Sequence, residues 1–137
     1  MKKRLCSILL VLCLVMTMLP TMALAVDGED GTQKHPWNIS AEGEENNVKA
    51  YLKQNDDSST YTLTISGTGA TADYSGEKDQ PWDGFRSSIT AVEISEGITH
   101  IGAHSLRQLT VINSALEIPG SLSSIGNCAL YMSSFTG

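Results

Sequence analysis

The chain has 137 residues, no more than one domain's worth, and its fifteen acidic side chains outnumber nine basic ones to give a net charge of −6 at pH 7. This charge balance repels phosphate groups, so it argues against nucleic acid and anionic membrane surfaces as partners. It favours a soluble protein or a basic partner.

The first 25 residues have the pattern of a secretory signal peptide. The basic residues Lys2 to Arg4 precede a nearly continuous apolar run over residues 5–19, and Ala23-Leu24-Ala25 supplies a small-x-small cleavage site. This run is shorter than the roughly 20 residues that span a bilayer, so a retained membrane anchor is the less favoured alternative. Cleavage after Ala25 predicts a secreted or cell-surface protein with no membrane association after the signal is removed.

Cleavage also changes the charge and the cysteine content. Six basic and fifteen acidic side chains remain, a formal charge of −9. Two of the three cysteines leave with the signal, so Cys128 has no partner for an intramolecular disulfide. We expect Cys128 to be a small buried apolar residue rather than a reactive thiol.

Two further regions precede the repeats described below. Residues 26–35 are acidic and lack apolar periodicity, so they predict a flexible tether. Residues 36–88 predict a small antiparallel β module, because short stretches in them alternate apolar and polar side chains. The expected strands are residues 37–39, 48–53 and 60–66.

The last of these strands has the clearest pattern. Tyr61, Leu63 and Ile65 share one face, and threonines occupy the other. A polar loop follows, and then Trp82 and Phe85, which we expect to plug the module onto the first repeat.

A sixteen-residue sequence motif then occurs twice, at residues 91–106 (copy 1) and 115–130 (copy 2). The two copies start 24 positions apart and are identical at six positions. A fixed period of this size indicates a solenoid, in which each unit buries its apolar face against its neighbours. Gly102 and Gly126 are expected where the backbone needs a positive φ or where adjacent coils approach closely. The positions expected inside are Val92, Ile94, Ile98, Ile101 and Leu106 in copy 1, and Leu116, Ile118, Leu122, Ile125 and Leu130 in copy 2.

The order of motifs resembles bacterial surface leucine-rich repeat proteins of the BspA-like type. The likeness rests on LTISGTGATADYSG, then PW, ITAVEISEGITHIG and EIPGSLSSIG, and it covers Trp37 to about Tyr131. It departs at Leu106 and Leu130, where the family has an aromatic residue. The resemblance implies a mainly β fold, with the β module leading into a leucine-rich-repeat solenoid of about two incomplete coils over residues 89–137. Because such proteins usually carry more repeats, we also expect this chain to be truncated.

The resemblance implies an exported, non-enzymatic binding protein, associated with adhesion to host matrix, host cells or other microbes. The family has no catalytic residues and needs no cofactor, so none are predicted here. An extracellular protein, on host matrix or another cell surface, is the expected partner.

Ligand contacts in a solenoid must come from the polar positions between the packed ones. Glu93 and Glu117 occupy equivalent places and are expected to form a small acidic ladder for a basic partner. The predicted contact surface comprises Glu93, His100, His104, Arg107 and Glu117, with Thr90 and Ser124 as further candidates.

Two groups of polar residues resemble metal sites but have simpler interpretations. His100 and His104 lie four positions apart near Glu96, but a coil corner does not bring such residues together as a helix would. Residues 55–57 offer oxygen atoms for calcium without the spacing of a calcium loop. Solvent-facing side chains are favoured in both places, and no metal is predicted.

Two other functions stay open. The first alternative is the N-terminal scaffold of a larger exported enzyme. The second alternative is a glycan-binding β module. The glycan alternative requires exposed aromatic rings, and its candidates are Trp37, Tyr51, Tyr74 and Trp82.

Overall fold

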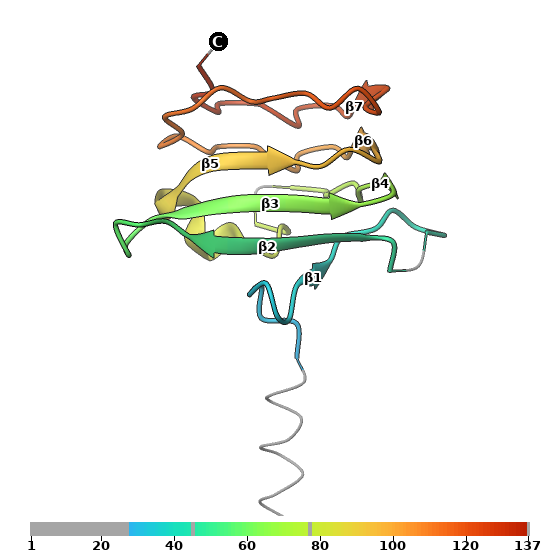
Figure 1. Ribbon diagram of the computed structural model, residues 1–137. Coiled ribbons are helices and arrows are strands. Elements are labelled where there is room, and N and C mark those ends of the chain that lie inside the picture. Colours follow the sequence, from blue (N-terminus) through green and yellow to red (C-terminus); the bar gives the residue numbers. More distant parts are fainter. Residues whose placement is uncertain (1–27, 45, 77, 137) are drawn as a thin grey trace, which may run out of the picture.

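The computed structural model describes residues 28–44, 46–76 and 78–136 and shows a mainly β protein (Figure 1). The predicted signal peptide and its cleavage site lie outside the described residues. Within the described ranges, no helix has the length and apolar character needed to cross a membrane. The elements are β1 (Trp37–Asn38), β2 (Val48–Gln54), β3 (Tyr61–Gly67), β4 (Gly69–Ala70), the 3-10 helix η1 (Asp83–Ser88), β5 (Ile89–Ile94), β6 (Ile98–Ile101) and β7 (Ser124–Ile125).

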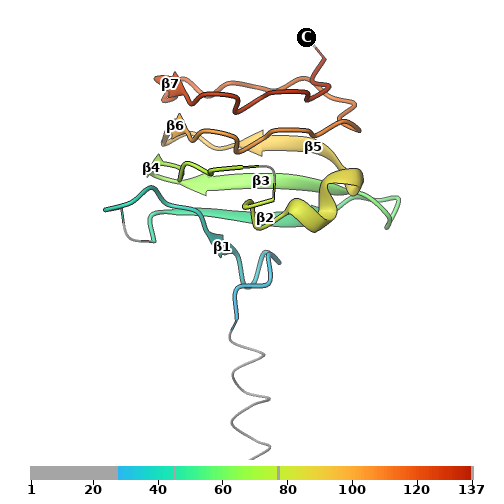
Figure 2. The same ribbon diagram turned by 180° about the vertical axis from the view of Figure 1, so that it is seen from behind.

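The described strands form two sheets, with the orders β1-β2-β3-β5 and β4-β6-β7. The chain is stacked in layers, with its C-terminal end at the opposite end of the stack from β1 (Figure 1). One layer supplies β3 and β4, and the next supplies β5 and β6. Figure 2, seen from behind, shows η1 on the other side of β2 and β3, where it forms part of the connection to β5.

The predicted antiparallel pairing of the first three strands is confirmed. Trp37 of β1 lies opposite Ala50 of β2, and Leu52 of β2 lies opposite Leu63 of β3. The turn between β2 and β3 is closed by Asp57, whose carboxylate accepts the backbone N–H of Thr60 at 2.9 Å. Asp57 therefore ends the turn and holds the register of the hairpin.

The sheet continues from the predicted β module into the first repeat. β3 pairs with β5 in parallel, with Leu63 opposite Val92 and Ile65 opposite Ile94. The predicted boundary at residue 88 thus falls within one hydrogen-bonded sheet. The division into two domains stays a prediction, but the two parts share a core.

The two copies lie side by side through the second sheet. β6 and β7 pair in parallel, with His100 opposite Ser124 and Ile101 opposite Ile125. Gly126 N–H also donates to Ile101 O at 2.7 Å. Both residue pairs of β6 and β7 are 24 positions apart, so the sequence period equals the distance along the chain between these two layers.

The backbone conformation recurs with the same period. His104 and Cys128 have φ angles of 59° and 55°, and Gln108 and Met132 have φ angles of 58° and 56°. These values lie in the left-handed region, which side-chain-bearing residues adopt infrequently. Two such pairs at a 24-residue spacing show that the copies share their corner geometry as well as their strands.

Close approach, rather than positive φ, explains the repeated glycine. A Cβ atom on Gly102 would lie 1.9 Å from Ala72 O, and one on Gly126 would lie 2.4 Å from Ala103 N. Both contacts are with backbone atoms of the preceding layer, which cannot move aside as a flexible side chain would. Glycine is therefore needed where adjacent layers touch.

An aromatic cluster fills the core beside β1 and η1. The rings of Trp37 and Trp82 have centroids 6.2 Å apart, and Tyr74 packs edge-on against Trp82 at 6.1 Å. Trp82 is 1% exposed, as expected of a plug. Phe85 instead lies at the edge of the cluster, 39% exposed, where it contacts Trp37 and Tyr61.

Copy 2 is less buried than predicted. Ile118 is 52% exposed, so the expectation that it lies in the core is wrong, and Ile125, at the uncovered side of copy 2, is 44% exposed. Cys128 is also exposed, which corrects its assignment as a buried residue. The physical reason is that copy 2 packs against copy 1 on one side, while the described residues leave its other side largely uncovered.

The described part of the predicted tether, residues 28–35, is attached to the sheet. Gly31 O accepts the N–H of Leu52 at 2.7 Å, and a carboxylate oxygen of Glu29 accepts the N–H of Asn38 at 2.9 Å. Gly31 is buried against the Trp37 ring. These contacts extend the folded region to the N-terminal side of Pro36 and correct the tether expectation for these residues.

Candidate functional site

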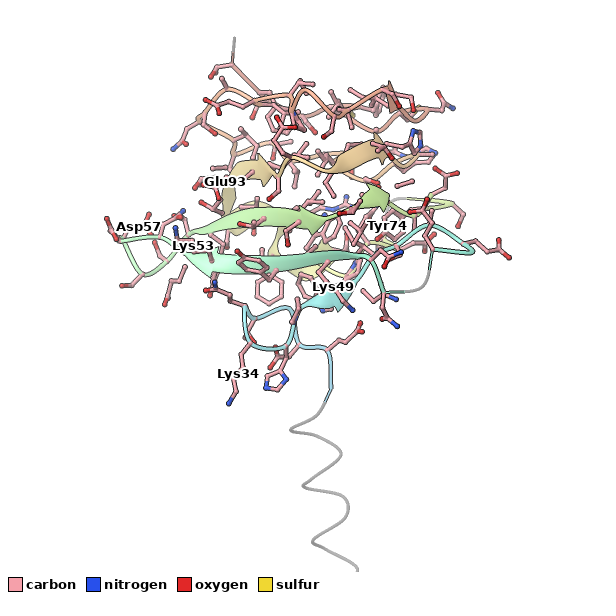
Figure 3. The ribbon with its side chains drawn as sticks, turned by 45° about the vertical axis from the view of Figure 1, so that its right-hand side comes forward. Lys34, Lys49, Lys53, Asp57, Tyr74 and Glu93 are labelled. Carbon is pink, nitrogen blue, oxygen red and sulfur yellow. The ribbon has the colours of Figure 1, made fainter. Side chains whose placement is uncertain are left out.

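The outward face of the first sheet carries a mixed set of polar side chains. Successive residues of a strand point to opposite faces, and Val48 and Ala50 of β2 are fully buried in the core. Lys49, Tyr51 and Lys53 therefore project from the opposite face. Figure 3 labels both lysines on β2, with Glu93 on β5 two strands away.

Strand register aligns these side chains into rows across the sheet. Tyr51 lies opposite Thr64, and Thr64 lies opposite Glu93. The Thr64 hydroxyl is 3.5 Å from a carboxylate oxygen of Glu93. Since Thr64 is 6% exposed and Glu93 is exposed, the carboxylate forms the accessible end of this row.

A groove of about 440 Å³ lies between β5 and the chain that follows copy 1. Residues 91–94 form one wall, and Ser114, Ala115 and Glu117 form the other. Glu93 and Glu117 therefore both line the groove, and their role as an acidic ladder for a basic partner stays a prediction. Ala91 and Ala115 leave the floor beside them shallow and open.

The groove exists because residues 115–118 do not pair with β5. On the N-terminal side of this segment, the chain is hydrogen-bonded to the preceding layer, because Asn113 N–H donates to Thr90 O at 3.0 Å. On the C-terminal side of the segment, the carboxylate of Glu96 accepts the N–H of Gly120 at 2.9 Å. Between these ties, residues 115–118 form no strand and have no backbone hydrogen bond to β5 in the described structure.

β5 consequently presents one unpaired edge to the groove. Ser95 N–H donates to Ile65 O of β3 at 2.9 Å, and residues alternate their backbone groups between the two edges of a strand. Val92 and Ile94 therefore direct their N–H and C=O groups toward residues 115–118. Within the described ranges, the first sheet ends at β5.

The carboxylate of Glu96 has a structural part in this arrangement. It accepts backbone N–H groups of Gly120 at 2.9 Å and Ser121 at 3.2 Å. The bond from Gly120 is the main reason that the pKa of Glu96 lies below its ordinary value. The negative charge is thus stabilised at the turn that fixes the far end of the groove.

His100 does not line the groove, because it belongs to β6 in the second sheet. Its ring lies between Ser124 Oγ, 2.6 Å from Nδ1, and Asp73 Oδ1, 3.8 Å from Nε2. These are the residue types of a hydrolase triad, but the Asp73 side chain is 74% exposed, whereas a triad base is oriented by a buried carboxylate. His100 is best described as a polar bridge across three layers.

His104 and Arg107 form a separate pair in the turn after β6. Arg107 Nη1 is 3.4 Å from His104 Nδ1, and the guanidinium carbon of Arg107 lies 5.2 Å from the centre of the Tyr131 ring. The predicted contact residues are thus distributed over three places: the Glu93–Glu117 groove, the His100 bridge and this pair.

The Asp57 carboxylate, one of the groups considered for calcium, accepts hydrogen bonds within the protein. Both carboxylate oxygens of Asp57 accept hydrogen bonds, from the N–H and hydroxyl of Thr60 and from the N–H of Ser59. The Thr60 hydroxyl bond is the largest cause of the lowered pKa of Asp57. Among the described residues, no group of three or more His, Cys, Asp or Glu side chains is placed to hold a metal ion.

Most of the aromatic rings considered for stacking on sugars are buried, so a glycan cannot reach them. Trp37 is 8% exposed and Trp82 is 1% exposed. Desolvation by burial raises the pKa of Tyr74 to about 12. Only Tyr51, of the four candidate rings, lies on the outward face of the first sheet, and one ring makes a poor platform for a glycan.

The groove itself was missed at the level of sequence. In the sequence, the identical residues Ala91 and Ala115 indicate only the repeat, yet in the structure both small side chains line the groove. The unpaired edge of β5 carries no signal in the sequence, because copy 2 repeats the strand pattern of copy 1 and predicts pairing.

Comparison with known proteins gives one informative similarity. No family model and no curated protein matches the chain. A crystal structure of a leucine-rich repeat protein from Eubacterium ventriosum ATCC 27560 is similar over 74% of this chain, with 27% sequence identity and a TM-score of 0.62. The chain spans 24% of the length of that protein. The similarity supports a fold of the leucine-rich-repeat type.

Proposed function

We propose that this is a secreted or cell-surface leucine-rich repeat protein of the BspA-like type, acting as a non-enzymatic protein-interaction and adhesion module. The repeats form a short solenoid that begins within the predicted β module. The partner is an extracellular protein, on host matrix or another cell surface, that presents basic side chains to Glu93 and Glu117.

The stacking of layers at a 24-residue spacing carries this proposal. Equivalent positions of the two copies lie side by side in β6 and β7, so His100 has Ser124 as its neighbour one layer away. This arrangement turns repeated residues into a continuous surface, which is how solenoid proteins contact extended partners. The similarity to a leucine-rich repeat protein favours the same interpretation.

Negative charge on this surface favours a partner with basic side chains. Glu93 and Glu117 are exposed and line one groove, and the residues after the predicted cleavage site carry a formal charge of −9. Exposed carboxylates mainly raise the rate at which a basic partner associates and fix the register in which it binds. Dissolved salt screens this attraction. The predicted interaction is therefore strongly dependent on ionic strength.

A binding assay against purified extracellular-matrix proteins tests the proposal. The double variant Glu93→Gln and Glu117→Gln should retain its circular dichroism spectrum and bind about tenfold more weakly at low salt. The matched control, Glu42→Gln with Asp56→Asn, removes the same charge from exposed positions outside the groove. Equal loss in both variants, or no binding by the unaltered protein, would contradict the proposal.

A further inference from the structure

The unpaired edge of β5, facing a groove with two carboxylates, can accept another strand. We propose that the groove between β5 and residues 115–118 binds an extended peptide by strand addition, with basic side chains directed at Glu93 and Glu117. This inference rests on the proposed function and specifies how a partner is held.

Backbone groups provide the first part of the argument. Val92 and Ile94 direct N–H and C=O groups toward the groove, and no described residue pairs with them. An exposed row of such groups is a template for an added strand. Main-chain hydrogen bonds then supply affinity whatever the partner's sequence, while side-chain contacts supply specificity.

The second part of the argument is that the facing wall of the groove, residues 115–118, is not paired with β5. Residues 115–118 lack backbone bonds to β5, and the segment is held by the bond from Asn113 before it and by Glu96 after it. Paired strands lie about 4.8 Å apart, so a strand between β5 and this segment requires about 9.6 Å. Outward movement of residues 115–118 breaks no sheet hydrogen bond but withdraws Leu116 from its packing against the core.

Side-chain alternation predicts the sequence that fits. Residues 91, 93, 115 and 117 share the outward face, while Val92 is 5% exposed and points to the core. An added strand has the same period of two. Its outward residues lie beside Glu93 and Glu117 and should be basic, and its inward residues lie beside Val92 and should be small and apolar.

A five-residue probe, acetyl-Val-Arg-Val-Arg-Val-amide carrying a fluorophore, tests this inference by fluorescence anisotropy. Binding should weaken about tenfold in the Glu93→Gln, Glu117→Gln variant and less than about twofold in the Glu42→Gln, Asp56→Asn control. A probe with glutamate in place of arginine should not bind. N-methylation of alternate backbone nitrogens on the edge-facing side should abolish binding, because it removes the donors that strand addition needs.

Hydrogen exchange of the full chain gives an independent readout. The amides of Val92 and Ile94 should exchange faster than that of Glu93 in the free protein, and should become protected when the arginine probe binds. Protection of these amides without the probe would show that residues 115–118 close onto β5, and would overturn the inference.

The outcomes separate this inference from the proposed function. Matrix-protein binding that depends on Glu93 and Glu117, combined with no probe binding or with equal binding of the N-methylated probe, refutes strand addition and leaves the interaction module intact. Failure of matrix-protein binding refutes the proposed function itself. Probe binding that meets all the controls supports strand addition.

Discussion

Equivalent isoleucines in the two copies should differ sharply in what they contribute to stability. Ile101 and Ile125 lie opposite each other in β6 and β7, 24 positions apart. Ile101 is 1% exposed, whereas Ile125 is 44% exposed. Replacement of each by alanine therefore compares one side chain in one backbone setting at two levels of burial.

The expected magnitudes follow from that burial. Truncation of a fully buried isoleucine to alanine costs about 2–5 kcal/mol, because a cavity remains where the surroundings cannot collapse. Burial of a whole isoleucine side chain is worth about 1.5–3 kcal/mol, so a side chain nearly half exposed retains roughly half of that. Without a closed cavity, Ile125→Ala should cost about 1 kcal/mol or less.

Urea unfolding followed by circular dichroism measures the difference. Ile101→Ala should lower the midpoint strongly and Ile125→Ala only slightly, with the same dependence on urea concentration. Equal losses for the two variants would refute the reasoning, since they would mean that Ile125 is covered in solution. Such a result would place further chain or a partner over copy 2.

Three other predictions follow from separate features. Gly102→Ala should destabilise the protein by at least about 1–3 kcal/mol in the same assay, because its Cβ would lie 1.9 Å from Ala72 O; an unchanged midpoint would show that the layers separate easily. Glu96→Gln should reduce the loss of thermal stability between pH 6 and pH 3. The pKa of Glu96 is lowered in the folded protein, so the ionised side chain stabilises the fold above the unfolded pKa of about 4.3. This stabilisation is lost as the pH falls through the folded pKa. A variant that keeps the full pH dependence would contradict this assignment. Mass spectrometry of exported protein should find an N-terminus directly after Ala25, and an intact first residue would disprove cleavage.

Local pattern in the chain was sufficient for the strands and for the spacing of the layers. Alternation over residues 48–53 and 60–66 predicted β2 and β3, and the antiparallel hairpin between them is confirmed. The 24-residue repeat predicted which residues lie side by side in β6 and β7. It also predicted that Gly102 lies where the backbone needs a positive φ or where layers approach closely, and the structure shows the close approach. The strands follow from side-chain direction within a few residues, and the layer spacing follows from the repeat, because equivalent residues adopt equivalent places in adjacent layers.

Contacts between layers decided the rest. β3 joins β5 in parallel, so the sheet crosses a boundary that composition and motif order had indicated. Ile118 is exposed although its place in the repeat predicts burial, and Cys128 is exposed although its residue type favours burial, because burial depends on what lies against a residue. The groove beside Glu93 has the same origin: two identical strand patterns can pair or separate, and only packing of the whole chain determines which occurs.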